Sequence, residues 1–449
     1  MQSHRNSLLV LVILILIGCK EQTKQNSSNN EILLVQEEME LLLKDKMLDV
    51  WYPVAIDSVD GGYLSMLDEN WKPFGNQSKF IVTQARHVWT LAKAMERYPD
   101  NPNYSRWAEQ GFQFLKNAMW DQEYGGFYEL RLKDGVRPEG KDSDDKRAYG
   151  NSFGIYASAA YAKASGNKEA LEFAKTAFRW LNEHSYDPDN GGYFQFLTKE
   201  GTPYHLVKKP GEMTFNQYFK DQNSSIHIME AYTELYRIWP NDTLGQRLDE
   251  LMLLIRDHYT NPEGYLSLFF TIDLKPISYR DSSIMNWNYD HVSFGHDIET
   301  AYLILDASDA LGKKDPRTDT VTKKMVDHSI EKGLDKNVGG LYYKGYYFLG
   351  EMAIVDDQKS WWVEAEAMNS LLLFDGLYPN QGYLEEFYGM WAYNKRYLID
   401  WDRGGWYNRG LDNYPDAITS NKGAHWKGPY HTFRSIANCI DMIGKRLDQ

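Results

Sequence analysis

Asp60-Gly61-Gly62-Tyr63 is the first of six similar phrases in this chain, and their recurrence indicates the fold. The other five also place glycine before an aromatic residue or before Leu-Tyr: Tyr124-Gly125-Gly126-Phe127, Asn190-Gly191-Gly192-Tyr193, Glu263-Gly264-Tyr265, Val338-Gly339-Gly340-Leu341-Tyr342 and Arg403-Gly404-Gly405-Trp406-Tyr407. Successive first glycines are 64, 66, 73, 75 and 65 residues apart, which leaves room for two helices in each unit. Such a period is typical of repeat proteins, in which each unit buries its apolar face against its neighbours.

Segments with helical periodicity fill the spaces between these phrases. Apolar residues recur in them at three- and four-residue intervals, and alternating strand patterns are almost absent. Six such units could stack as an open solenoid or close into a ring. Because closure removes the exposed ends, we expect an all-α fold, an (α/α)6 toroid of six helical hairpins that closes on itself. Because glycine readily adopts φ > 0, the phrases should form short β-hairpin loops at one mouth of the ring, with their aromatic side chains around a central cavity.

The composition favours one large domain and a neutral ligand. Aromatic residues make up 14% of the chain, and such rings stack well on sugar faces. The formal net charge of −14 argues against nucleic acid and anionic membrane surfaces as partners. No break in composition marks a second domain, so we expect a single domain over residues 31–449, present as a monomer.

The N-terminus resembles a bacterial lipoprotein signal. The apolar run Leu8–Ile17 is too short to span a bilayer and suits a signal peptide. It leads into Leu16-Ile17-Gly18-Cys19, which is similar to a lipobox. We expect residues 1–18 to be removed, Cys19 to be lipidated, and residues 19–30 to form a polar tether; an ordinary secretory signal or a membrane anchor is the alternative.

These expectations place the chain in the bacterial cell envelope, facing the periplasm or the exterior, with the lipid as its only membrane contact. Only Cys439 would remain as a free thiol in the mature chain, so no intrachain disulfide can form.

Three histidines lie near predicted helix starts. His227 lies four residues after Asn223, on the same helix face. His296 follows Ser293, a candidate N-cap, and shares a face with Glu299. The third, His431, follows Pro429, which favours a helix start. If these helices are the inner ones of the toroid, the three imidazoles converge at one mouth. A helix N-terminus also lowers the pKa of a nearby imidazole, as a general base near pH 7 requires.

Three other kinds of site were weighed. Zinc could use the histidines with Glu299, but there is no His-x-x-x-His pair and no Cys ligand cluster, so we expect no metal. No Gly-rich nucleotide-binding motif is present, so we expect no cofactor. Glycoside hydrolysis needs two carboxylates at the scissile bond but leaves the histidines unexplained. Its candidate carboxylates are Asp297, Glu299, Glu364 and Glu366.

Five ordered motifs carry a family resemblance: Gln84-Ala85-Arg86-His87-Val88-Trp89, Asn223-Ser224-Ser225-Ile226-His227-Ile228-Met229-Glu230-Ala231-Tyr232, Phe294-Gly295-His296-Asp297-Ile298-Glu299, Trp361-Trp362-Val363-Glu364-Ala365-Glu366 and Trp426-Lys427-Gly428-Pro429-Tyr430-His431. With them the chain resembles the N-acylglucosamine 2-epimerase superfamily and, within it, the cellobiose 2-epimerases. The resemblance implies an (α/α)6 barrel, in agreement with the six repeats. It also implies inversion of carbon 2 of a reducing-end sugar without a redox cofactor.

The resemblance assigns roles to the histidines. Inversion requires ring opening, removal of the C2 proton, a stabilised cis-enediolate, and return of a proton from the other face. His296 and His431 look like the two opposed bases, and His227 like the acid/base of ring opening. Which of the pair removes the proton depends on the direction of reaction.

The resemblance also implies the residues that bind the sugar. Arg86 would hold the enediolate oxygen through a charge-assisted contact, although a structural ion pair is the alternative. Hydroxyl groups would be bound by Asn223, Glu299 and Glu366, with Glu299 alternatively orienting His296. Rings that would stack on the two sugars are Trp362, Trp426 and Tyr124, whereas Trp361 fits core packing equally well.

The expected substrate is a β-1,4-linked disaccharide such as cellobiose or mannobiose. An aldose–ketose isomerase of mannose-type sugars on the same scaffold remains open, because it shares the enediolate. A glycan-binding lipoprotein without catalysis is also open, but such a protein has no use for three converging histidines.

Overall fold

The computed structural model describes residues 29–140, 143–207, 220–280 and 286–448. The expected signal peptide, the lipidation site Cys19 and residues 19–28 of the expected tether lie outside these ranges. Residues 29 and 30, which we expected in the tether, already belong to a helix over 29–41 that continues through η1 (Leu42–Leu48) and α2 (Asp49–Trp51). No helix in the described ranges has the length and apolarity that crossing a bilayer requires.

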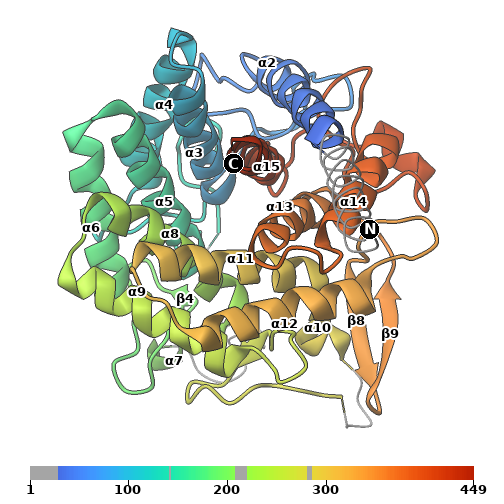
Figure 1. The fold of residues 1–449 in the computed structure, drawn as a ribbon. Coiled ribbons are helices and arrows are strands. Elements are labelled where there is room, and N and C mark those ends of the chain that lie inside the picture. The colour runs from blue at the N-terminus through green and yellow to red at the C-terminus, as the bar shows by residue number, and fades with distance from the viewer. Residues whose placement is uncertain (1–28, 141–142, 208–219, 281–285, 449) are drawn as a thin grey trace, which may run out of the picture.

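Within these ranges, six inner helices form a closed ring, which confirms the expected (α/α)6 toroid (Figure 1). Each inner helix packs against the next, and the last packs against the first. In ring order they are α3 (Ile81–Arg97), α5 (Ala148–Ser165), α8 (Gln222–Ile238), α11 (Phe294–Ala310), α13 (Trp361–Leu377) and α15 (Tyr430–Leu447).

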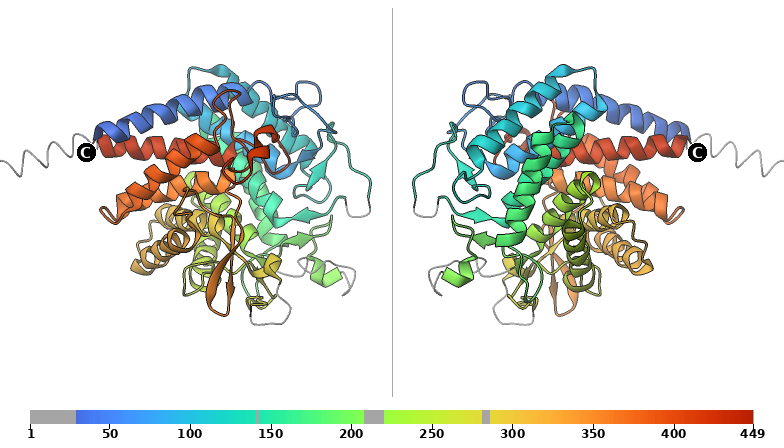
Figure 2. Two further views of the ribbon diagram at one scale, coloured as in Figure 1. Left: turned by 90° about the vertical axis from the view of Figure 1, so that its right-hand side faces the viewer. Right: turned by 90° about the vertical axis from the view of Figure 1, so that its left-hand side faces the viewer.

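The outer helices pack behind this ring. Each forms a hairpin with the inner helix before it, and the helix over residues 29–41 packs on α15. Figure 2 shows that helix (blue) beside α15 (red), so the two ends of the described chain close the ring together. The other outer helices are α4 (Pro102–Phe114) with η2 (Leu115–Met119), α6 (Lys168–His184), α9 (Asp242–Leu254) with η4 (Ile255–Tyr259), α12 (Pro316–Gly333) and α14 (Tyr383–Tyr397).

Local sequence explains where most outer helices begin. Asn101, Asn167, Asn241 and Asp315 each accept a hydrogen bond from a backbone N–H in the first turn of the helix that follows. Inner helices α3, α5, α11 and α13 begin without such a side-chain cap. All inner helices begin at the same end of the ring, which we call the mouth, and the other end is the opposite mouth.

The six glycine phrases form tight turns at the mouth. In the first turn, Gly61 and Gly62 have φ values of 85° and 64°, which glycine adopts without strain. Oδ1 of Asp57 accepts hydrogen bonds from the N–H groups of Val59 and Asp60, at 3.1 and 2.9 Å. The expected hairpin loops are therefore present, although their own pairing is limited to isolated bridges such as Ile56 with Tyr63.

A buried ion pair joins five of these turns to a lysine that precedes an inner helix. The pairs are Lys79–Asp57 at 2.6 Å, Lys146–Asp121 at 2.8 Å, Lys220–Asp187 at 2.6 Å, Lys359–Asp335 at 2.7 Å and Lys422–Asp400 at 2.6 Å. The turn at Gly264 differs, because Asn261 and Val292 occupy the corresponding positions. Because both partners are buried, each pair holds its turn in one position against the ring, and losing one partner would leave an unpaired charge.

Short antiparallel strands then connect neighbouring units around the mouth. The pairs are β1 (Lys79–Phe80) with β2 (Leu130–Arg131), β3 (Lys146–Arg147) with β4 (Phe196–Leu197), β5 (Lys220–Asp221) with β6 (Phe269–Phe270), and β7 (Val292–Ser293) with β8 (Lys344–Phe348), which also pairs with β9 (Glu351–Asp356). The expected long loop between Arg131 and Lys146 lies between β2 and β3. Three short helices complete the mouth: α7 (Tyr204–Val207), α10 (Trp287–Asp290) and η5 (Pro415–Thr419).

Candidate active site

A cavity of about 290 Å³ lies at the mouth, in the centre of the ring. Most of its lining comes from the first two turns of the inner helices, because these helices all begin there. Eight residues predicted from the sequence line it: Arg86, Asn223, His227, His296, Glu299, Trp362, Trp426 and His431. The three imidazoles that were expected to converge thus share one cavity.

His431 is held from behind by a carboxyl group. Its Nδ1 lies 2.8 Å from Oε1 of Glu366 on α13, which leaves Nε2 as the ring nitrogen available to the cavity. Burial lowers the pKa of His431 well below its ordinary value, and the charges of Arg86 and Arg434 add to this effect. The imidazole is therefore neutral, as a base must be. Burial also raises the pKa of Glu366 to about 8, although Arg434 opposes the rise.

His227 is held in a similar way. Its Nδ1 lies 2.8 Å from Oε2 of Glu230, one turn along α8. Burial alone would raise the pKa of Glu230, but Arg434 and His227 lower it to about 2, so this carboxylate is ionised. An ionised carboxylate at Nδ1 fixes the ring and leaves Nε2 as the free nitrogen.

His296 has a different partner. Its Nδ1 lies 2.8 Å from the hydroxyl oxygen of Ser293, which stands at the N-cap position of α11 but caps no backbone N–H. The pKa of His296 is lowered to about 3, mainly by burial and then by the neighbouring His227. The neutral state expected from the helix N-terminus is therefore present, but burial is its main cause.

Trp362 lies against two of these imidazoles. Its ring centroid is 4.9 Å from that of His296 and 5.7 Å from that of His431. By contrast, Trp426 stands at the rim: its side chain is 51% exposed and packs edge-on against Phe80. One indole thus walls the inner part of the cavity, and the other is accessible to a ligand entering the mouth.

Arg86 supplies a positive charge that no carboxylate in the described part of the chain neutralises. Among the described residues it forms no ion pair within 4.0 Å, its Nε has no hydrogen-bond partner, and its Nη2 donates to the hydroxyl of Tyr149 at 3.3 Å. The guanidinium packs on the rings of Phe153 and Tyr430, at 4.5 and 4.9 Å from their centroids. The structural ion pair considered as the alternative role is therefore not what the described residues form. A buried, uncompensated cation is suited to an anionic reaction intermediate.

Two of the carboxyl groups considered for a hydrolase have structural contacts. Asp297 accepts a hydrogen bond from the N–H of Leu266 at 2.9 Å, and Glu364 accepts one from Leu341 at 2.8 Å. Burial raises the pKa of both groups well above the ordinary range. In two other repeats, the side chains of Gln84 and Asn151 accept the hydrogen bond from the corresponding backbone N–H group. Side chains at this helix position therefore anchor the glycine turns.

Two predicted binding residues lie elsewhere than expected. Glu366 does not line the cavity, because it sits behind His431 and supports that ring rather than facing a hydroxyl group. Tyr124 lies outside the cavity on the surface of its turn, 39% exposed, with Nζ of Lys199 over its ring at 4.9 Å. The turn directs Phe127, and not Tyr124, into the core.

The structure adds residues that sequence reasoning did not single out. Tyr149 lines the cavity as the second residue of α5, the position that Asn223 holds in α8 and Trp362 in α13. Aligning the lysines that precede the inner helices would have revealed it. Trp361, which the sequence left undecided, also lines the cavity, as does Asn408.

The carboxylates behind His431 also raise the question of a metal. Glu299, Glu366 and His431 present possible ligand atoms within 4.8 Å of one another. Nη2 of Arg434 lies 2.7 Å from Oε1 of Glu366 and also contacts Oε1 of Glu299. Because a guanidinium already neutralises these oxygens, the donor set fits an ion-pair network better than a divalent cation.

Comparison with known proteins agrees with this geometry. The family described as N-acylglucosamine 2-epimerase matches residues 61–435. A cellobiose 2-epimerase of Bacteroides fragilis is 28% identical, over 92% of this chain and 99% of its own length. The solved cellobiose 2-epimerase of Spirochaeta thermophila has a TM-score of 0.78 at 27% identity and covers 93% of this chain and 98% of its own. A D-mannose isomerase of Marinomonas mediterranea is 24% identical, over 89% of this chain and 95% of its own length.

Proposed function

Since the chain belongs to the N-acylglucosamine 2-epimerase family, we propose that it inverts carbon 2 of the reducing-end sugar of β-1,4-linked disaccharides. The observation that carries this proposal is the cavity at the mouth, where three imidazoles meet the uncompensated Arg86. An enzyme that moves protons around an enediolate needs both features.

The reaction begins with the closed sugar. His227 removes the proton of the anomeric hydroxyl, the C1–O5 bond breaks to give the C1 carbonyl, and the proton passes to O5. His296 or His431 then takes the C2 proton. The electron pair of that C–H bond forms the C1–C2 double bond, and the carbonyl pair moves onto O1. Arg86 stabilises the resulting negative charge.

The enediolate charge raises the pKa of the second imidazole, because a nearby anion favours the protonated ring, and this imidazole takes up a proton from water. It then returns that proton to C2 from the other face, the carbonyl forms again, and the first imidazole releases the proton it took from C2 to water. Trp362, in contact with both imidazoles, fixes their separation. The ring then closes on the inverted sugar.

A disaccharide fits the mouth better than a single sugar does. A second cavity of about 530 Å³ adjoins the first and shares Trp361, Asn408 and Trp426 with it. The exposed Trp426 stands between the two as a stacking surface for the second ring. The isomerase alternative shares the enediolate and differs in the carbon that regains the proton. Because a D-mannose isomerase is among the relatives, isomerisation remains the second candidate function.

We also propose that the mature chain is a monomer tethered by lipid at Cys19 in the bacterial cell envelope. The apolar run and the Leu16-Ile17-Gly18-Cys19 phrase support this location. The full chain expressed in a bacterial host should fractionate with membranes, and Cys19→Ala should release it. Equal membrane association of both forms would contradict lipidation at Cys19.

The experiment that tests the activity uses the chain without residues 1–19, incubated separately with cellobiose, β-1,4-mannobiose and mannose. Chromatography and NMR should identify a C2-epimeric disaccharide, and His296→Ala should abolish its formation. Fructose from mannose with no disaccharide product would identify the isomerase, and free monosaccharide would identify a hydrolase. Binding that persists in His296→Ala, with no turnover by either form, would leave only a glycan-binding protein.

A further inference from the structure

A layer of charged side chains lies behind the catalytic histidines. Three inner helices each contribute one carboxyl group to it: Glu230 from α8, Glu299 from α11 and Glu366 from α13. All three contact the guanidinium of Arg434, which comes from α15 one turn after His431. Two of the three, Glu230 and Glu366, also contact Nδ1 of His227 and His431.

We propose that Arg434 is a positioning residue that sets the tautomer and the orientation of both His227 and His431 without touching the sugar. The proposal rests on the proposed function, since it concerns how the same site is prepared for proton transfer.

The contact with Glu366 shows how one arginine can fix the tautomer of His431. Oε1 of Glu366 lies 2.7 Å from Nη2 of Arg434 and 2.8 Å from Nδ1 of His431. An oxygen that accepts from a guanidinium carries no proton of its own, so the hydrogen between it and the imidazole belongs to Nδ1. When Glu366 is protonated, its proton sits on Oε2, which has no hydrogen-bond partner among the described residues. His431 therefore presents an unprotonated Nε2 to the cavity in both states of Glu366.

The contact with Glu230 acts on His227 in the same way. Oε1 of Glu230 accepts hydrogen bonds from Arg434 and from the hydroxyl of Tyr430. This leaves Oε2 to accept from Nδ1 of His227 at 2.8 Å. Because Arg434 is a main cause of the low pKa of Glu230, removing it would weaken the acceptor that fixes His227.

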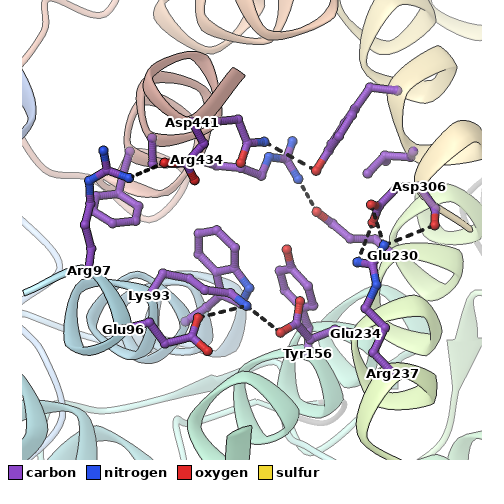
Figure 3. Close-up of a pocket in the computed structure, with 16 residues that line it drawn as sticks. Lys93, Glu96, Arg97, Tyr156, Glu230, Glu234, Arg237, Asp306, Arg434 and Asp441 are labelled. Atoms are coloured by element: carbon purple, nitrogen blue, oxygen red, sulfur yellow. Dashed lines mark hydrogen bonds and ion pairs between the residues drawn. The ribbon is translucent and has the colours of Figure 1, made fainter. Parts of the chain in front are cut away.

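Arg434 is reached from the opposite mouth and not from the sugar site. It lines a separate cavity of about 500 Å³ at the opposite mouth together with Glu230, as Figure 3 shows, and does not line the cavity that holds the three histidines. An effect of Arg434 on catalysis must therefore pass through the residues it holds. The same cavity contains Arg237, which pairs with Asp306 at 2.7 Å and, among the described ion pairs, meets neither Glu230 nor Glu366. Arg237 thus provides a matched control.

Loss of Arg434 should also change the pH dependence. Ionised Glu366 makes His431 a stronger base, so activity should rise as Glu366 loses its proton. Arg434 lowers the pKa of Glu366, whereas Glu299 and Glu230 raise it, so removing the arginine moves this rise to higher pH. In the part of the chain that the structure describes, the charged and titratable groups that face Glu366 are Arg434, His431 and Cys439 from α15, Glu299 from α11 and Glu230 from α8.

The test compares R434Q and R434K with R237Q on the substrate that wild type epimerises. R434Q should lower kcat by about 100-fold or more, because an imidazole in the wrong tautomer cannot act as the base, with little change in KM. Its alkaline rise in kcat should lie about 1 to 3 pH units higher than in wild type. R434K should keep the position of that rise and still lose activity, since an ammonium cannot bridge three carboxylates.

R237Q should keep the wild-type kcat and pH profile. A wild-type profile in R434Q, or an equal displacement in R237Q, would overturn the proposal. If R434Q does not fold, ¹⁵N NMR of labelled histidines in wild type and R434K provides the decision. Wild type should show Nδ1-protonated His227 and His431, and R434K a changed signal. Nε2-protonated rings in wild type would refute the role of Arg434. Because NMR needs no turnover, it separates this proposal from the proposed activity.

Discussion

Replacing Arg86 with methionine should abolish most of the activity while leaving the fold intact. The side chain is buried, yet within the described residues no carboxylate pairs with it. Its removal therefore leaves no unpaired negative charge in the core. Methionine is long enough to fill much of the same space between Phe153 and Tyr430.

The expected loss follows from the role of the charge. A donor that faces the developing anion contributes about 2.7–4 kcal/mol to the transition state, which corresponds to about 10²- to 10³-fold in kcat. Because the charge on O1 develops only after the C2 proton is removed, KM should change much less than kcat. The free energy of unfolding should stay within about 1 kcal/mol of wild type, since a buried and uncompensated cation does not stabilise the fold.

Steady-state kinetics on the preferred disaccharide, thermal melting and C2 exchange measured in D₂O provide the assay. Arg86→Lys serves as the control, because it keeps the charge but loses the two-pronged contact, and it should lie between wild type and Arg86→Met. A melting temperature far below wild type would show that Arg86 is structural. A loss that appears only in KM would show that it binds the sugar without stabilising the enediolate.

Three further predictions concern stability, pH and substrate size. Lys146→Met should lower the free energy of unfolding by about 3–5 kcal/mol in chemical denaturation, because it leaves the buried Asp121 unpaired. The double variant with Asp121→Leu should recover much of this loss, and no recovery would contradict the ion-pair explanation. The pKa of His296 is about 3 in the folded state against an ordinary 6.5, so unfolding takes up a proton between these pH values. The free energy of unfolding should therefore fall as the pH drops through this range. The fall should be shallower in His296→Asn, and an identical pH dependence would contradict the low pKa. Trp426→Ala should raise KM for a disaccharide by about tenfold and affect mannose little, and an equal effect on both would show that the indole does not bind the second sugar.

The glycine phrases predicted six helical hairpins, because their spacing reports the size of one hairpin, and the ring was preferred to an open solenoid because closure removes the exposed ends. They could not reveal the buried lysines, since a single Lys before a helix has no distinctive pattern until five of them are seen to meet an aspartate in each turn. Residues 29 and 30 were also assigned to the tether and not to the domain, because the polar sequence before residue 31 resembles a tether.

The residues of the candidate site could likewise be predicted only in part. His227, His296 and His431 could be found because they stand at equivalent ends of inner helices. The charged residues behind the histidines could not be found in this way. Glu230 and Arg434 each lie one turn from a histidine, but in a sequence they look like ordinary surface charges. Only the ring brings four helices close enough to bury these charges together.

Tyr124 and Glu366 do not line the sugar cavity as expected, because a sequence does not show the direction and depth of a side chain. In the phrase that contains Tyr124, the glycines reverse the chain so that Phe127 enters the core and Tyr124 faces solvent. The family resemblance implied that Glu366 binds a hydroxyl group, but its carboxyl group lies one layer deeper, behind His431.

The measurement that tests the central claim most directly is ¹H NMR of a disaccharide turned over in D₂O. The account predicts that deuterium enters C2 of the reducing residue in the epimeric product, because the proton removed by one imidazole is replaced by one from the other. Epimeric product that keeps protium at C2 would contradict the two-histidine mechanism, and deuterium at C1 of a ketose would assign the chain to isomerisation instead.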